Sequence, residues 1–152
     1  MPMPKLNALH LLARNGTLAL AAGALCLTAL AQNRRPSSQH PVLGAWQWTD
    51  TRNNCTEVYD FRPDGTVPVV SGDERSDNTY TISETPDAQG FFTLTMFTVK
   101  DYGGKDCGDD ETDNTSMENV IYLLFEPRLT EFIICSEPRV EACFGPLRRV
   151  KR

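Results

Sequence analysis

The chain has 152 residues, a formal net charge of −5, five cysteines and two histidines. At this length a single folded domain is the default. An apolar fraction of 40% beside 23% charged residues is ordinary for a globular protein and excludes wholesale disorder.

The segment 1–31 is predicted to be a secretory signal peptide. Residues 17–30 (TLALAAGALCLTAL) form an apolar run behind two basic residues, and the run ends in the small-x-small pattern Ala29-Leu30-Ala31. The run is shorter than the about 20 residues that cross a membrane as a helix. These features indicate cleavage after Ala31 and no stable membrane span afterwards, with the mature protein in a bacterial periplasm or secreted. An uncleaved anchor is the alternative.

Removing this segment changes the net charge and the number of cysteines. Lys5, Arg14 and Cys26 are lost, so the net charge becomes −7 and four cysteines remain. An even number in an exported chain of this size indicates two disulfides. Because no two cysteines have C-x-x-C spacing and His40 is the one remaining histidine, neither a metal site nor a cofactor is expected. The remaining cysteines are Cys55, Cys107, Cys135 and Cys143.

The mature chain is predicted to be all-β. Residues 32–41, rich in Pro, Ser and Gln, are expected to form a flexible leader, and 150–152 a basic tail. Between them no window has the apolar spacing of an amphipathic helix, and short runs rich in Val, Ile, Thr, Tyr and Phe alternate with turn residues. The pattern predicts an antiparallel meander that forms a small barrel or a sandwich. The expected strands are 43–50, 55–62, 66–71, 78–83, 91–99, 118–126, 129–136 and 142–149.

The cysteines fit this arrangement in one of their three possible pairings. Cys135 and Cys143 flank the turn of the last predicted hairpin. Cys107 lies in the long loop 100–117, which a bond to Cys55 would tie down. We favour this pairing among the three.

Strand alternation places several aromatic side chains on a common face. Residues two apart in a strand point to the same side, which groups the aromatic residues of each predicted strand. These side chains either line a ligand-binding interior or simply fill a narrow barrel. They are Trp46, Trp48, Tyr59, Phe61, Tyr80 and Phe92.

Two short motifs resemble lipocalin-like proteins. Gly44-Ala45-Trp46 is similar to the Gly-x-Trp opening of lipocalins, and 61–66 (FRPDGT) is similar to the F-x-x-D-G-T turn of small bacterial lipocalin-like domains. Over 42–149 the chain looks like a small exported bacterial lipocalin-like protein. This resemblance implies an antiparallel barrel of about eight strands that binds a small apolar or aromatic molecule, or a lipid. It also implies that Arg148 or Arg149 packs on Trp46.

Catalysis is not expected. From residue 42 onward there is no histidine, so Ser-His-Asp and Cys-His arrangements are unavailable. A hydrolase that uses carboxylates remains as the enzymatic alternative. Glu57 is its candidate, because alternation places this residue on the same strand face as Tyr59 and Phe61. A solvated carboxylate at a strand end is the simpler interpretation.

The segment 101–118 is strongly acidic and gives a second functional hypothesis. It carries seven acidic residues and one lysine, which suits docking of a basic protein partner, as an inhibitor or immunity protein would do. A solvated loop and calcium binding are the other interpretations, although the spacing does not fit an EF-hand. Residues 43–147 hold 20 acidic and 7 basic residues, which argues against nucleic-acid binding. The candidate partner-binding residues are Asp101, Asp106, Asp109, Asp110, Glu111 and Asp113.

Overall fold

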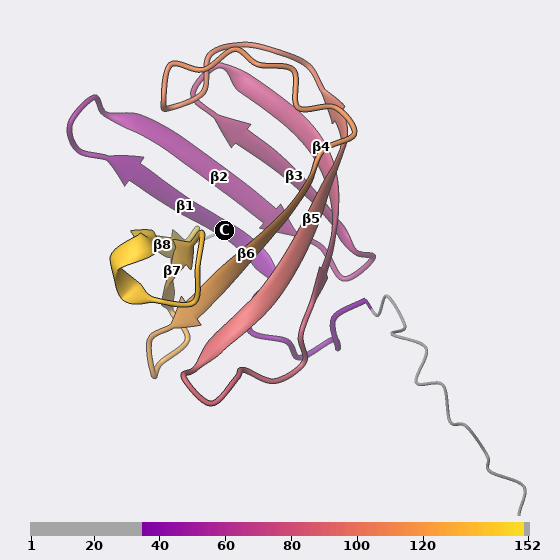
Figure 1. Cartoon of the computed structure of the whole chain (residues 1–152), viewed down its shortest axis with the longest axis vertical. Helices are drawn as coiled ribbons and strands as arrows, with labels where there is room; N and C mark the ends of the chain where they lie inside the picture. Colours follow the sequence, from indigo (N-terminus) through magenta and orange to yellow (C-terminus); the bar gives the residue numbers. More distant parts are fainter. Residues whose placement is uncertain (1–34, 151–152) are drawn as a thin grey trace, which may run out of the picture. The chain divides into compact units, whose positions relative to one another are not determined.

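The computed structural model describes residues 35–150, all within one compact unit, Gln32–Arg152. These residues form a closed, eight-stranded antiparallel barrel in which each strand pairs with the next and β8 returns to β1 (Figure 1). The predicted signal peptide, the first residues of the leader and the last two residues of the tail lie outside the described residues. The prediction of an all-β meander barrel is confirmed.

The strands follow the alternating apolar pattern closely. Short β-branched and aromatic runs form them, and polar turns separate them, most of which contain Gly or Pro. One short 3₁₀ turn, Val140–Ala142, precedes the last strand. The strands are β1 Gly44–Asp50, β2 Cys55–Phe61, β3 Thr66–Ser71, β4 Glu74–Ile82, β5 Phe91–Asp101, β6 Glu118–Phe125, β7 Glu131–Cys135 and β8 Cys143–Arg149.

The largest difference from the predicted strands is the start of β4. The sequence predicts a start at 78, whereas the strand begins at Glu74. Residues 74–77 are polar and show no apolar alternation, but they pair directly with the preceding strand, from Ser71↔Glu74 onward. Gly72, with φ 58°, closes the tight turn that makes this pairing possible. Cross-strand pairing therefore extends β4 where the hydrophobic pattern gives no signal.

One end of the barrel is filled by packed aromatic and aliphatic side chains. Trp46, Phe132, Leu94, Leu123 and Leu147 have exposed fractions of 0–1%. The Trp46 ring meets Phe132 edge to face, with centroids 4.6 Å apart, and its Nε1 donates a hydrogen bond to a backbone carbonyl. This cluster forms the hydrophobic core.

A basic residue of the last strand seals this core. The guanidinium of Arg149 lies 4.1 Å from the Trp46 ring centroid, and it donates hydrogen bonds to the carbonyls of Pro41 and Leu43. The expectation that Arg148 or Arg149 packs on Trp46 is thus confirmed for Arg149. This contact ties β8 to β1 and to the segment that leads into β1.

The end of the predicted leader packs on the barrel. His40 is 4% exposed, its Nε2 lies 3.1 Å from the carbonyl oxygen of Ser83, and its ring meets Phe92 edge to face. Its Nδ1 accepts the backbone N–H of Val42. Burial lowers the pKa of the His40 imidazole. These contacts make His40 part of the closed end of the barrel.

Both favoured disulfides are present. Cys55–Cys107 joins the start of β2 to the loop between β5 and β6, and Cys135–Cys143 joins β7 to β8. Disulfides are typical of proteins in oxidising compartments, such as the periplasm or the extracellular space. Within residues 35–150, no helix is long and apolar enough to cross a membrane.

The loop 102–117, orange at the top of Figure 1, lies against the β3–β4 turn. The carbonyl of Lys105 accepts the backbone N–H groups of Asp73 and Glu74. Gly104 permits this approach, because a Cβ at this position would lie 2.6 Å from the Asp73 carbonyl oxygen. The loop is therefore fixed at the end of the barrel opposite His40, by backbone hydrogen bonds as well as by the Cys55–Cys107 bond.

Candidate functional site at the polar end of the barrel

Of several recesses in the surface of residues 35–150, two contain aromatic residues singled out from the sequence at positions outside the closed core, Trp48 in one and Tyr59 in the other. The larger, of about 720 Å³, is a groove at the seam between β1 and β8. These strands pair at Trp46↔Arg149 and Gln47↔Arg148, and the seam opens next to Pro146, which has no N–H to donate. We call this recess the seam groove.

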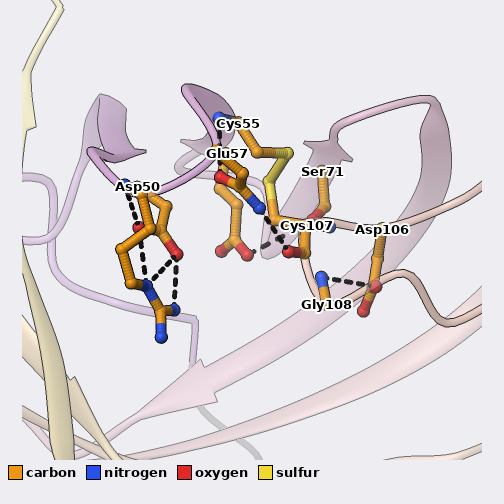
Figure 2. Close-up of polar contacts among 9 residues, drawn as sticks. Asp50, Cys55, Glu57, Ser71, Asp106, Cys107 and Gly108 are labelled. Atoms are coloured by element: carbon orange, nitrogen blue, oxygen red, sulfur yellow. Dashed lines mark hydrogen bonds and ion pairs between the residues drawn. A yellow bond between two sulfur atoms is a disulfide. The ribbon is translucent and has the colours of Figure 1, made fainter.

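Charged side chains of the seam groove are engaged within the protein. Asp50 is buried and holds the Arg52 guanidinium through several hydrogen bonds, drawn in Figure 2. Arg148 donates a hydrogen bond of 2.8 Å to Glu131, and Arg149 is bound to backbone carbonyls as described above. These charged groups of the seam groove therefore already have partners within the protein.

The second recess lies inside the polar end of the barrel and has a volume of about 210 Å³. We call it the mouth pocket. It is formed where the inward-facing residues of β2 to β6 change from apolar to polar, and the loop 102–117 contributes to its wall. Its lining residues are Glu57, Tyr59, Val69, Ser71, Glu74, Ser76, Asn78, Met96, Thr98, Asp106, Asn114 and Asn119.

Glu57 is the centre of a hydrogen-bond network in this pocket. The Tyr59 hydroxyl donates to Glu57 Oε2 at 2.7 Å, and the Ser71 hydroxyl donates to Oε1 at 3.2 Å. The backbone N–H of Cys107 donates in turn to Ser71 Oγ. Figure 2 shows Glu57 and Ser71 beside the Cys55–Cys107 disulfide. The disulfide and this network together join the loop to the interior of the barrel.

Burial and mutual repulsion affect the acidic groups of the pocket. Burial raises the pKa of the Glu57 carboxyl, and the hydrogen bonds from Tyr59 and Ser71 oppose this rise. The pKa of Glu74 is also raised, by burial first and then by the neighbouring Asp101 and Asp106. Burial and the Glu57 charge hold the pKa of Tyr59 well above its usual value. The mouth pocket therefore concentrates negative charge in a partly desolvated space.

Glu57 gives a testable pH dependence. Because its pKa is higher in the folded protein than in the unfolded chain, the folded state binds more protons between these two values. The free energy of unfolding should therefore fall as pH rises from the normal glutamate range through the raised pKa of Glu57. Glu57→Gln, which keeps the shape and accepts the Tyr59 hydrogen bond, should flatten this decline.

Urea unfolding at several pH values from 4 to 8 measures this slope. The exposed Glu141→Gln variant is the matched control and should retain the wild-type slope. An unchanged slope in the Glu57→Gln protein would contradict the assignment.

Two buried polar side chains face the mouth pocket without a full set of partners. Thr98 is 5% exposed and Asn78 is 3% exposed, and both line the pocket. Asn78 Nδ2 donates to the Val67 carbonyl and to Ser76 Oγ. Among the described residues, neither the Thr98 hydroxyl nor Asn78 Oδ1 has a hydrogen-bond partner. No fully enclosed polar side-chain atom of the described residues lacks a partner, so both oxygens keep some accessible surface, and both residues line the pocket.

Most carboxylates of the acidic loop stabilise the loop itself. Each of four aspartates accepts the backbone N–H two residues further along, a side-chain turn typical of Asp. Asp109 and Glu111 are exposed and, among the described residues, their side chains make no hydrogen bond or ion pair. The four turn-forming residues are Asp101, Asp106, Asp110 and Asp113.

The six aromatic residues singled out from the sequence separate into three places. Trp46, Phe61, Tyr80 and Phe92 belong to the core, with exposed fractions of 0%, 2%, 3% and 9%. Tyr59 lines the mouth pocket, and Trp48 lines the seam groove with its ring 5.1 Å from Phe144. Of the six, Tyr59 alone is placed beside the unpartnered polar groups. A ligand-binding role for the core aromatics stays a prediction.

The sequence reasoning missed Ser71, Asn78 and Thr98. The two-residue period of a strand could have indicated the inward position of Asn78 and Thr98. Asn78 lies on the same strand face as Tyr80 and Ile82, and Thr98 lies on the same face as Leu94 and Met96. Among residues 35–150 no group of three or more acidic, histidine or cysteine side chains is placed to hold a metal ion. Comparison of the chain with protein-family models, with curated proteins and with solved structures gives no match.

Proposed function

We propose that the protein is an exported, lipocalin-like binding protein without catalytic activity, which holds a small molecule in the mouth pocket. Its signal-peptide pattern, with cleavage predicted after Ala31, and its two disulfides support export to a bacterial periplasm or to the medium. The Gly-x-Trp opening and the eight-stranded barrel support the lipocalin-like assignment.

The observation that carries the proposal is the pair of buried side chains Asn78 and Thr98, which line the pocket and whose oxygens keep some accessible surface. Buried polar groups in folded proteins are nearly always hydrogen-bonded, and exceptions often mark a functional site. Small-molecule sites also combine a concave apolar wall with a few convergent polar groups. Val69, Met96 and the Tyr59 ring supply such a wall here.

The pocket volume limits the ligand. At about 210 Å³ it is smaller than the roughly 300–1,000 Å³ of sites for drug-sized molecules. The packed core occupies the other end of the barrel, so we place the ligand at the mouth and not among the core aromatics. The apolar or aromatic part of the ligand would rest on Tyr59 and Met96.

A fragment screen by thermal shift tests this function, with a variant that fills the pocket as the discriminating reagent. Ser76 lines the pocket from β4, and Ser76→Leu should fill part of its volume. Thr93→Leu introduces the same side chain at an exposed position of β5 and is the control. We expect fragments that raise the melting temperature of the wild-type protein and of Thr93→Leu, and that have no effect on Ser76→Leu.

If every fragment that stabilises the wild-type protein stabilises folded Ser76→Leu equally, the pocket is not the binding site. A screen without any stabilising fragment would also count against the proposal. Docking of a basic protein through the acidic loop stays a prediction; four of its six candidate residues form turns within the loop.

A further inference from the structure

We propose that the ligand of the mouth pocket is a small organic cation, a primary ammonium on an apolar or aromatic body. This inference rests on the proposed function and specifies the chemical class of the ligand. Three features of the pocket lead to it: the sign of its charge, its unpartnered oxygens and its apolar wall.

The charged residues that line the pocket all have the same sign. Glu57, Glu74 and Asp106 contribute carboxylates from β2, β4 and the loop, and no Lys, Arg or His is among the described lining residues. Elsewhere in residues 35–150 several acidic side chains pair with an arginine, as Asp50 does with Arg52. The mouth pocket is thus a partly buried group of carboxylates without a counter-charge from the protein. A cationic ligand would supply this charge.

The unpartnered oxygens of Asn78 and Thr98 favour a cation that donates hydrogen bonds, such as an ammonium group, over a cation without N–H donors. An ammonium has three N–H donors and no acceptor. Since Asn78 Nδ2 is already bound to Val67 and Ser76, the side-chain atom that Asn78 leaves for a ligand is its acceptor Oδ1. The Thr98 hydroxyl can also accept. These acceptors, together with a carboxylate, match the three donors of a primary ammonium.

Organic cations fit better than metal ions. No group of three or more acidic, histidine or cysteine side chains within the described range is placed to hold a metal, so the carboxylates surround the pocket without converging on one point. The Tyr59 ring, Met96 and Val69 offer contacts to a carbon skeleton that a metal ion cannot use. Cations also interact favourably with aromatic faces.

Calorimetric titration with benzylamine, benzyl alcohol and benzoate separates charge from shape, because the three probes share one ring and differ in the charge of one substituent. We expect benzylamine to bind roughly tenfold or more tightly than benzyl alcohol, and benzoate not to bind. Glu74→Gln should weaken benzylamine binding roughly tenfold. Thr98→Val, which removes one neutral hydrogen bond, should weaken it about fivefold.

Asp109→Asn is the control for charge. Asp109 is exposed, does not line the pocket and has a φ of 62°, which asparagine tolerates well. This variant should bind benzylamine as the wild type does. Equal weakening in Asp109→Asn and Glu74→Gln would show a long-range charge effect and would overturn the site.

The outcomes separate this inference from the proposed function. If benzyl alcohol binds as tightly as benzylamine, or if benzoate binds best, the ligand class is wrong while binding in the mouth pocket stands. If none of the probes binds, the inference is overturned, and the fragment screen with Ser76→Leu decides the proposed function independently.

Discussion

Trp46→Ala should lower the free energy of unfolding by about 3–5 kcal/mol, the usual cost of truncating a fully buried large aromatic residue. Trp46 is 0% exposed and meets Phe132 and Phe125 edge to face. Its loss leaves a cavity in the middle of the core and removes the ring on which the Arg149 guanidinium rests. A domain of ordinary stability, about 5–15 kcal/mol, would lose a large part of its stability.

Trp48→Ala is the matched control, since Trp48 lies two residues away on the same strand but is only partly buried. Urea unfolding followed by circular dichroism should give a clearly smaller loss for this variant. Equal losses would contradict the assignment of Trp46 to the closed core and of Trp48 to the seam groove.

Removing the Cys55–Cys107 bond should cost more than removing the Cys135–Cys143 bond. The first closes a loop across 52 residues of sequence separation and the second across 8. In the chain-entropy description the losses are about 4 and about 2.5 kcal/mol. Denaturant unfolding of Cys55→Ala/Cys107→Ala and Cys135→Ala/Cys143→Ala proteins measures both.

The Cys55–Cys107 disulfide is also expected to affect ligand binding. It holds the loop 102–117 over the mouth pocket, where the Cys107 N–H donates to Ser71 Oγ. Its removal should therefore weaken ligand binding, whereas removal of the bond between β7 and β8 should not. Unchanged binding in folded Cys55→Ala/Cys107→Ala would show that the loop does not shape the pocket.

Local sequence signals predict the barrel well, because they coincide with the physical causes of its strands. The alternation of Phe92, Leu94 and Met96 gives both the strand and its buried face. The turn before Thr66 follows from Asp64 and Gly65, since Asp64 accepts the Thr66 N–H and Gly65 adopts a φ of 85°. The observed disulfide pairing is the one favoured among three from where the predicted strands place the four cysteines.

The polar lining of the mouth pocket was harder to predict from the sequence than the strands of the barrel. Asn78 and Thr98 are polar residues in strands, and such residues ordinarily face solvent. They lie inside because the regular register of β4 and β5, which runs from Ile82↔Leu94 to Asn78↔Thr98, continues the inward-facing rows of both strands up to this pair. The strand period indicates the inward direction of each residue, but the pairing of β4 with β5 joins segments some 20 residues apart and is not given by a local pattern.

The acidic loop shows a limit of counting charges. A run of carboxylates suggested a surface for a basic partner, but the spacing of four aspartates from the next glycine or threonine also predicts side-chain turns. Asp101 and Asp106 each accept an N–H from a glycine two positions on, and Asp110 and Asp113 from a threonine. Turn chemistry read from the sequence would have predicted these local bonds, while docking of a basic partner on the loop stays a prediction.

The central claim is that ligands enter the polar end of the barrel and not its aromatic core, and amide chemical-shift mapping by NMR tests it most directly. On titration with benzylamine, or with the best fragment from the screen, we predict that the largest shifts fall on Ser71, Asn78, Thr98 and Cys107, around the mouth pocket. Shifts centred on Trp46, Phe61 and Phe132 in the core, or on Trp48 and Arg148 in the seam groove, would contradict it.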